Sequence, residues 1–188
     1  MRVLTLNEES FHATCAALGK KISGSYVPDL VLGILTGGEY VAARLFADTP
    51  HASVELRRPS TADKERAGLL FRLLRQSPRW VTDALRIAEA RMLAMKTRKR
   101  QKRTVELPAE VIRMIEGARR VLVVDDAVDS GATLRDILDA VGRVAGRHEV
   151  RSAAITVTTR RPLHMPDYYL YHNSTLIRFP WSKDYRKT

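Results

Sequence analysis

Short apolar runs alternate along this chain with stretches whose apolar residues recur at helical spacing. Residues 31–35, 121–124 and 150–158 are predicted strands, and the continuous apolar character of the first two is typical of strands buried on both faces. Helical spacing follows at 41–46 and again at Leu134, Ile137, Leu138 and Val141. Strand and helix therefore alternate, which predicts an α/β fold: an open, mostly parallel, twisted sheet flanked by helices.

Two further helices are predicted from their first turns. Asn7 suits the cap of a helix that places the single cysteine, Cys15, in the core. Pro108 suits the first turn of a helix over 109–117, because proline has no N–H to leave unpaired there. The residues of that helix expected to face the sheet are Val111, Ile112, Met114 and Ile115.

The run 121–124 leads directly into two acids, Asp125 and Asp126, and soon afterwards into a turn of small residues. That turn consists of Ser130, Gly131, Ala132 and Thr133. Its N–H groups would point inward at a helix start, where the helix dipole also favours an anion, so the turn suits a phosphate monoester. The two acids would repel a phosphate and are expected to face sugar hydroxyls or a Mg²⁺ ion. Together they predict a site for a ribose 5-phosphate that carries a metal-bound pyrophosphate.

Residues 125–133 resemble the 5-phosphoribosyl 1-pyrophosphate signature of the type I phosphoribosyltransferases. The order is two acids, two small or apolar residues, Asp129, a hydroxyl residue, glycine, any residue and threonine, and the match is complete. The resemblance implies transfer of ribose 5-phosphate to a ring nitrogen of a nucleobase, with release of pyrophosphate. The alternative is an ordinary Ser-Gly turn between a buried strand and a capped helix.

The same resemblance implies a role for each signature residue. Asp125 and Asp126 would hold the ribose hydroxyls and stabilise the cation that develops on the sugar. Asp126 would also reach Mg²⁺, the expected cofactor, through bound water. Asp129 would take or orient the proton on the base, and the turn Ser130–Thr133 would bind the 5-phosphate.

A second glycine-containing turn follows the strand at 31–35 and consists of Thr36, Gly37 and Gly38. Paired glycines alone usually mark only a turn. In this position they resemble the family's pyrophosphate loop, which in relatives often has a non-proline cis peptide before the first glycine, here Thr36–Gly37. Many purine enzymes carry Lys or Arg where this chain has Thr36, so a positive charge is missing there.

The positive charge of the chain is concentrated in one segment. The formal net charge is +11, and residues 57–103 hold 15 Lys and Arg against 4 Asp and Glu, which equals the whole excess. Helices are predicted at 63–75 and 78–95, before a basic run without apolar periodicity. By the resemblance, 57–104 is a basic helical insertion that closes as a flexible lid over an anionic substrate. A solvated helix face with a basic linker, and contact with nucleic acid, are the alternatives.

The C-terminal part, 160–188, holds half of the aromatic residues and is expected to form a small hood. Its Pro-Asp-Tyr-Tyr and Phe-Pro-Trp elements resemble the hood of short microbial xanthine-, guanine- and hypoxanthine-type purine phosphoribosyltransferases. There Pro180 and Trp181 would border the base. The alternative is that these residues are ordinary strand and core aromatics.

The segment after the strand at 150–158 departs from those relatives. They usually place a lysine near the end of this strand to bond the 6-oxo group of the base. This chain has Thr158, Thr159, Arg160 and Arg161 instead. Either arginine could donate to an oxo or carboxylate group on the base, with Arg160 as the named candidate, and an unusual base stays open.

The chain of 188 residues suits a single domain, 1–188. It has no apolar stretch long enough to cross a bilayer and no signal peptide at its start, so a cytoplasmic protein without membrane contact is expected. Walker, Gly-x-Gly-x-x-Gly, His-Glu-x-x-His and Cys-x-x-Cys motifs are absent from the sequence. The histidines are scattered and expected to lie at the surface or in hydrogen bonds rather than on a metal: His12, His51, His148, His164 and His172.

The expected partners are 5-phosphoribosyl 1-pyrophosphate, a nucleobase and a second copy of the chain in a dimer. Two rival functions stay open. One is a regulator with this fold that binds nucleic acid through the basic segment. The other is a phosphoribosyltransferase of a specialised pathway that acts on a non-standard base.

Overall fold

The computed structural model describes residues 2–55, 105–173, 175–182 and 185. The strands are β1 (Arg2–Thr5), β2 (Leu30–Ile34), β3 (His51–Val54), β4 (Arg120–Val128), β5 (Glu149–Val157), β6 (Tyr168–His172) and β7 (Thr175–Arg178). The helices are α1 (Glu8–Ser23), α2 (Gly37–Leu45), α5 (Ala109–Gly117) and α6 (Ala132–Ala145). The basic segment 57–104, with its two predicted helices, lies outside the described residues.

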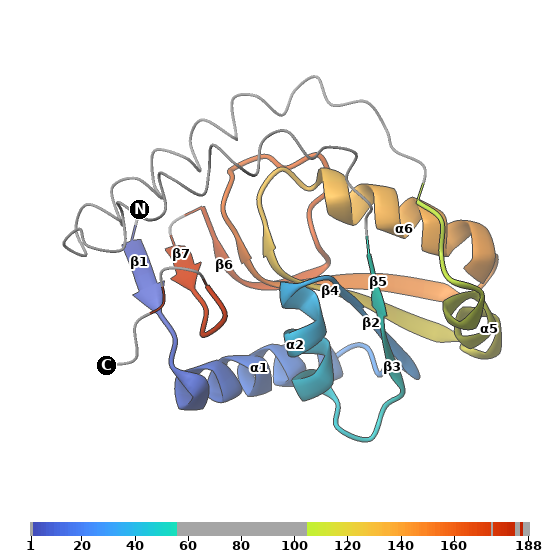
Figure 1. Ribbon diagram of the computed structural model, residues 1–188, viewed down its shortest axis with the longest axis horizontal. Coiled ribbons are helices and arrows are strands. Elements are labelled where there is room, and N and C mark those ends of the chain that lie inside the picture. The colour runs from blue at the N-terminus through green and yellow to red at the C-terminus, as the bar shows by residue number, and fades with distance from the viewer. Residues whose placement is uncertain (1, 56–104, 174, 183–184, 186–188) are drawn as a thin grey trace.

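Five strands form one parallel sheet in the order β3-β2-β4-β5-β6. Helices cover both of its faces, with α1 and α2 on one side and α5 and α6 on the other (Figure 1). The α/β fold predicted from the alternation of strands and helices is thereby confirmed. A smaller parallel pair joins β1 to β7, so the first described strand lies beside the last one.

The position of β4 at the centre of the sheet explains why residues 121–124 are all apolar. Val121 and Val123 belong to the core cluster under α5 and α6, whereas Leu122 and Val124 belong to the cluster under α1 and α2. All of these side chains are fully buried. A strand covered on both faces needs apolar residues at every position, not at alternate ones.

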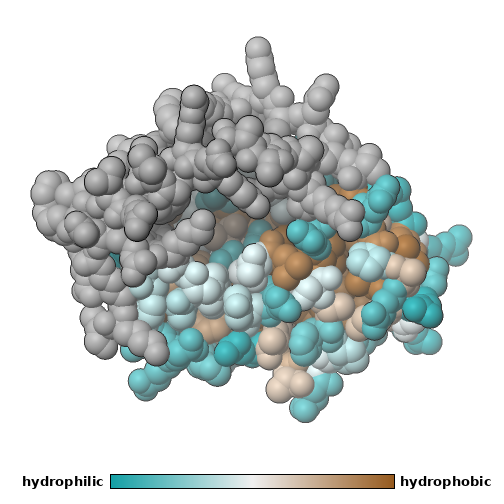
Figure 2. Space-filling view, in the orientation of Figure 1, coloured by the Kyte–Doolittle hydropathy of each residue, from teal (hydrophilic) through white to brown (hydrophobic). Residues whose placement is uncertain are grey.

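The first helix confirms the two expectations placed on it. Asn7 caps α1 in a capping box with Ser10, and Cys15 is buried in the core. Burial raises the pKa of the Cys15 thiol to about 12, so the thiol is neutral and unreactive at physiological pH. On the face seen in Figure 2, the described surface over α1 and α2 is mainly hydrophilic, as expected of amphipathic helices. No helix among the described residues is long and apolar enough to span a membrane.

Several element boundaries differ from the expected ones. The helix predicted at 41–46 begins already at Gly37, and β4 continues beyond 124 through both acids to Val128. In α5, Val111 and Ile115 are buried and Met114 packs partly on the core, but Ile112 is only half-buried. Its position is the one of the four that turns away from the sheet at 3.6 residues per turn.

Candidate functional site

The glycine turn after β2 lies directly against the acids at the end of β4. The two strands are parallel neighbours, with Gly33 opposite Val124, so their carboxyl ends reach the same edge of the sheet. A Cβ atom on Gly37 would overlap the carboxylate of Asp126, and one on Gly38 would overlap the carbonyl oxygen of Val124. Only glycine permits this approach, and it brings together two segments that the sequence shows far apart.

The structure corrects the expected position of the cis peptide in this turn. The cis bond joins Leu35 to Thr36, one residue earlier than the Thr36–Gly37 bond named from the resemblance. Thr36 has helical backbone angles and precedes the first residue of α2, so the peptide between Thr36 and Gly37 already belongs to the helix start. Leu35 and Thr36 are exposed, whereas the two glycines are buried.

The acids Asp125 and Asp126 are partly buried side by side, and both are held by backbone or indole N–H groups. The N–H of Asp126 donates to Oδ1 of Asp125 at 2.9 Å, and the N–H of Ala127 donates to Oδ1 of Asp126 at 2.8 Å. The indole N–H of Trp181 donates to Oδ2 of Asp126 at 3.2 Å.

Two neighbouring carboxylates in a partly dry site resist ionisation. Burial, and next the negative charge of Asp126, raise the pKa of Asp125 well above its usual range. Burial also raises the pKa of Asp126, although hydrogen bonds, including that from Trp181, partly offset the effect. A bound cation, or hydroxyl groups that donate to the acids, would relieve this cost.

Asp129, the third acid of the signature, lies just past the end of β4 and is exposed. Its Oδ1 accepts a hydrogen bond of 2.6 Å from the hydroxyl of Thr158, which follows β5 and is buried. Thr158 in turn donates its backbone N–H to the carbonyl of Val128 at 3.0 Å. The carboxylate is therefore oriented by a neighbouring strand, a contact that sequence reasoning missed because a threonine after a strand carries no signal of its own.

The turn Ser130–Thr133 leads into α6 without a side-chain cap. Gly131 stands at the cap position with a positive φ of 72°, a conformation that favours glycine. The hydroxyl of Ser130 accepts a hydrogen bond of 3.2 Å from the N–H of Ala132. The start of this 14-residue helix therefore offers N–H groups and a positive dipole end to an anion.

A second loop closes over the glycine of this turn. A Cβ on Gly131 would lie 2.5 Å from the carbonyl oxygen of His164, so the loop after β5 packs on it directly. The N–H of Leu163 also donates to the carbonyl of Ser130 at 2.8 Å. The turn is thereby fixed from outside, which keeps its backbone in one arrangement.

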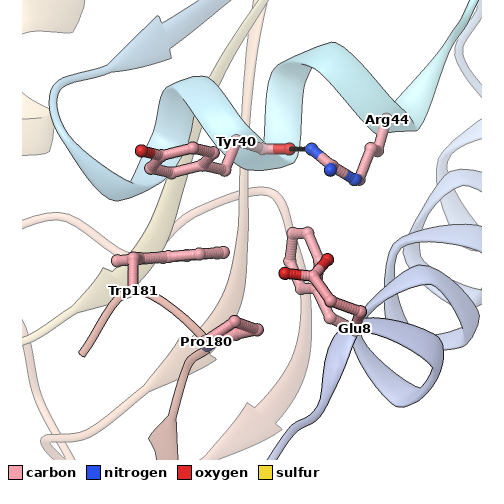
Figure 3. A pocket seen from close by; sticks show the side chains of 6 residues that line it. Glu8, Tyr40, Arg44, Pro180 and Trp181 are labelled. Carbon is pink, nitrogen blue, oxygen red and sulfur yellow. Dashed lines mark hydrogen bonds between the residues drawn. The ribbon is translucent and has the colours of Figure 1, made fainter. Parts of the chain in front are cut away.

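Trp181 lies at the centre of an aromatic cluster. Its ring is nearly parallel to those of Tyr40 and Phe179, with centroid distances of 4.6 and 4.8 Å, and the edge of Phe11 meets it at 4.9 Å. Figure 3 shows the ring of Tyr40 lying over that of Trp181. Both residues line a cleft of about 200 Å³. The residues that line this cleft are Glu8, Phe11, Tyr40, Arg44, Pro180 and Trp181.

The tyrosines of the Pro-Asp-Tyr-Tyr element and Arg160 are the other named parts of the expected hood. Tyr168 and Tyr169 are strand residues of β6, where the Tyr168 hydroxyl bonds to Ser25 at 2.9 Å and Tyr169 lies under Lys21. Arg160 is exposed. The geometry therefore brings the acids of the signature, the glycine turn and Trp181 together. The role of Arg160 stays a prediction.

Comparison with known proteins gives the family. A sequence model of the phosphoribosyl transferase domain matches residues 73–185. No curated protein matches the sequence.

Solved structures share the fold over nearly the whole chain. A purine phosphoribosyltransferase from Pyrococcus horikoshii is 20% identical, with a TM-score of 0.61, and the match covers 97% of this chain and 95% of that one. A xanthine-guanine-hypoxanthine phosphoribosyltransferase from Helicobacter pylori is 16% identical, with a TM-score of 0.60 and coverage of 96% and 94%. A hypothetical protein from Neisseria gonorrhoeae with bound ppGpp is 18% identical, with a TM-score of 0.58 and coverage of 96% and 89%. Since the family match spans more than half of the chain and includes both acids and the turn before α6, this protein belongs to the phosphoribosyl transferase domain family.

Proposed function

We propose that the protein transfers ribose 5-phosphate from 5-phosphoribosyl 1-pyrophosphate to a purine base and releases pyrophosphate. The observation that carries this proposal is the meeting of three elements at one edge of the sheet. The glycines Gly37 and Gly38 touch the end of β4, the acids Asp125 and Asp126 stand beside them, and the uncapped start of α6 follows. Loop amides, a diol-binding pair of acids and a phosphate site together match the three parts of that donor.

The 5-phosphate is assigned to the turn Ser130, Gly131, Ala132 and Thr133. Backbone N–H groups of the first turn of α6 donate to the phosphate oxygens, with hydroxyls of Ser130 and Thr133 beside them. The dipole of a helix contributes typically 0.3–1 kcal/mol to such an anion near the surface. The supporting observation is that Gly131 stands at the cap position of this helix and makes no side-chain hydrogen bond there, while the Ser130 hydroxyl accepts from the first helical N–H, that of Ala132.

The leaving pyrophosphate is assigned to the turn Thr36, Gly37 and Gly38. Its contribution is through backbone amides and the Thr36 hydroxyl, because no cationic side chain stands in this turn. Asp126, packed against Gly37, lies at the junction between this turn and the ribose. The ribose hydroxyls donate to Asp125 and Asp126, whose negative charge stabilises the cation that develops as the bond from C1 to pyrophosphate breaks.

The two acids also fit a Mg²⁺ ion. Hard oxygen ligands suit this cation, and it is usually held in proteins by one or two carboxylates together with substrate oxygens and water. The described residues contain no group of three or more His, Cys, Asp or Glu side chains that could hold a metal ion by itself. Asp126, alone or with Asp125, would therefore hold Mg²⁺ in company with the donor, and the ion would supply charge neutralisation for the pyrophosphate.

The proton on the attacking base is assigned to Asp129. Thr158 holds one of its carboxylate oxygens and leaves the other to accept the proton as the new bond from the base nitrogen to C1 forms. The purine is the proposed base because the Pyrococcus and Helicobacter proteins of similar fold are described as purine enzymes. Trp181 and Arg160 are the proposed contacts to the base. A homodimer in the cytoplasm completes the proposal.

The test is to incubate the protein with MgCl₂, 5-phosphoribosyl 1-pyrophosphate and one base at a time from a panel of purines, pyrimidines and other nitrogen heterocycles. Release of pyrophosphate together with a new nucleotide is expected with a 6-oxopurine. If turnover is seen only with a heterocycle that is neither a purine nor a pyrimidine, the substrate is a non-standard base and not a purine. The control is the same reaction without base, in which nucleotide must not form.

A regulator that binds nucleic acid is the second candidate, favoured by the charge of residues 57–103. It predicts salt-dependent retention of a labelled duplex or single strand, with no turnover on any base. Turnover without such retention excludes it. Filter binding at two salt concentrations, run on the same preparation as the turnover assay, decides between the two functions.

A further inference from the structure

We infer that Trp181 is a positioning residue, whose indole N–H fixes the carboxylate of Asp126 in the site. The inference rests on the proposed function and deepens it, because it gives the C-terminal segment a task beyond bordering the base. The contact joins residues 55 positions apart in the sequence. Three observations support it: the ring of Trp181 is held, the carboxylate of Asp126 is held at both oxygens, and the same cluster reaches the glycine turn.

The indole is held by rings from two helices and from the segment that follows β7. Tyr40 of α2 lies at an interplanar angle of 21° to it and Phe179 at 9°, while Phe11 of α1 meets it at 84°. Phe11 and Phe179 are themselves buried in the core. Aromatic pairs of this kind stabilise their arrangement beyond the apolar area they bury. The direction of the indole N–H is therefore set by packing rather than by the hydrogen bond alone.

The carboxylate of Asp126 receives one N–H at each oxygen. Ala127 donates its backbone N–H to Oδ1 at 2.8 Å, and Trp181 donates to Oδ2 at 3.2 Å. Indole is a donor only, so this contact has one direction. With both oxygens engaged, the side chain cannot rotate without losing a hydrogen bond, and its remaining lone pairs point in fixed directions. A group that must meet a sugar hydroxyl or a hydrated cation benefits from this fixed direction.

The aromatic cluster also ties this acid to the glycine turn. Tyr40 stands in the first turn of α2, three residues after Gly37, and Gly37 is the glycine on which the carboxylate of Asp126 packs. Figure 3 shows Tyr40 reaching from α2 over Trp181. The proposed pyrophosphate turn, Asp126 and the C-terminal segment thus meet at Trp181. Loss of the indole N–H should therefore lower the rate of catalysis and not only weaken contact with the base.

The hydrogen bond can be tested without any activity measurement. The chain has two tryptophans, so a ¹⁵N-labelled sample has two indole N–H signals, and Trp181→Phe identifies the one from Trp181. In Asp126→Ala that signal should move upfield and exchange faster with solvent, while the Trp80 signal stays in place. If the Trp181 signal is unchanged in Asp126→Ala, the hydrogen bond does not exist in solution and the inference is overturned.

The kinetic test uses Trp181→Phe, which keeps a flat aromatic ring and removes the N–H donor together with part of the indole. We expect kcat to fall about tenfold, equivalent to about 1.4 kcal/mol, with less than about a twofold change in the KM of the base. The matched control is Tyr26→Phe, which removes a hydroxyl that donates to the carbonyls of Val121 and Glu149 at 3.1 and 2.9 Å, at the other end of the same strands. This control should leave kcat unchanged, so a general loosening of β4 is separated from the loss of the Trp181 contact.

The outcomes separate the inference from the function on which it rests. A wild-type protein that turns over no base contradicts the proposed function, and the NMR test still decides whether the contact exists. An active wild type whose Trp181→Phe variant shows only a higher KM for the base overturns the inference and leaves Trp181 as a wall of the base site. A lower kcat with an unchanged KM supports it, provided that thermal unfolding shows the variant to be folded.

Discussion

The two ends of β4 differ in chemistry although they belong to one continuous strand. At its amino end, Val121, Leu122 and Val123 are fully buried, and the strand is tied by the hydroxyl of Tyr26. At its carboxyl end, two acids share a partly buried site in which burial raises the pKa of both. The buried apolar side chains at the amino end stabilise the folded state. The two acids at the carboxyl end lower its stability, and they lie where ligands are expected. Stability and the proposed function are thus divided along a single strand, and each end can be tested separately.

The largest effect is expected at the carboxyl end, from Asp129→Asn. The variant keeps an oxygen that can accept from Thr158 but removes the carboxylate that is proposed to take the proton. A positioned acid or base contributes typically 10²–10⁴-fold to the rate, so kcat should fall at least about 100-fold. Calorimetry should find the affinity for 5-phosphoribosyl 1-pyrophosphate within about twofold of wild type. Equal losses in turnover and in donor affinity would contradict the assigned role.

At the amino end, Leu122→Ala should lower stability without altering the chemistry of the site. The side chain is fully buried between β4 and the helices α1 and α2, and truncation of such a leucine costs about 2–5 kcal/mol. Urea unfolding should show this loss, while kcat per folded molecule stays near the wild-type value. A fall in kcat comparable to that of Asp129→Asn would show that the two ends are not separable.

Gly37→Ala tests the contact between the glycine turn and the acids. Its added methyl group would overlap the carboxylate of Asp126, and overpacking of this kind costs about 1–3 kcal/mol. We expect donor affinity to fall about tenfold in calorimetry. The matched control is Gly142→Ala in α6, where an added Cβ meets nothing within 4 Å. That variant should gain about 0.5–1 kcal/mol of stability and keep donor affinity, because alanine is the better helix former.

The smallest effect is expected from Asp125→Asn, and it should depend on pH. The unfolded chain loses the Asp125 proton near pH 4, whereas burial and the charge of Asp126 keep the proton on the folded protein to higher pH. The folded state therefore binds more protons in that range, and wild-type stability falls as pH rises through it. The asparagine variant, whose side-chain oxygen still accepts from the N–H of Asp126, avoids this loss.

Thermal unfolding in EDTA at several pH values measures the difference. At pH 7 the variant should be more stable than wild type, and each 1 kcal/mol gained corresponds to about 2–4 °C in a domain of this size. Near pH 4 the two proteins should unfold at the same temperature. A variant that is less stable than wild type at pH 7 would mean that the ionised acid is well stabilised in the folded protein.

The sequence predicted most of what depends on local pattern. The strands and helices around residues 121–141, the glycine turn after β2 and the parallel sheet follow from hydrophobic period and turn residues. Contacts across the fold were out of reach, because the bonds from Thr158 to Asp129 and from Trp181 to Asp126 join residues 29 and 55 positions apart. Such pairs depend on strand order and register, which β3-β2-β4-β5-β6 sets and a single sequence does not reveal.

The pairing of β1 with β7 connects the first strand of the sequence to Asp126. Arg2–Thr5 run beside Thr175–Arg178, and the backbone continues from Arg178 through Phe179 and Pro180 to Trp181. The N–H of Leu6 also donates to the carbonyl of Arg178 at 2.9 Å, just before that segment begins. Changes in the first strand would therefore be transmitted along this short path to the indole and from there to Asp126 at the edge of the sheet.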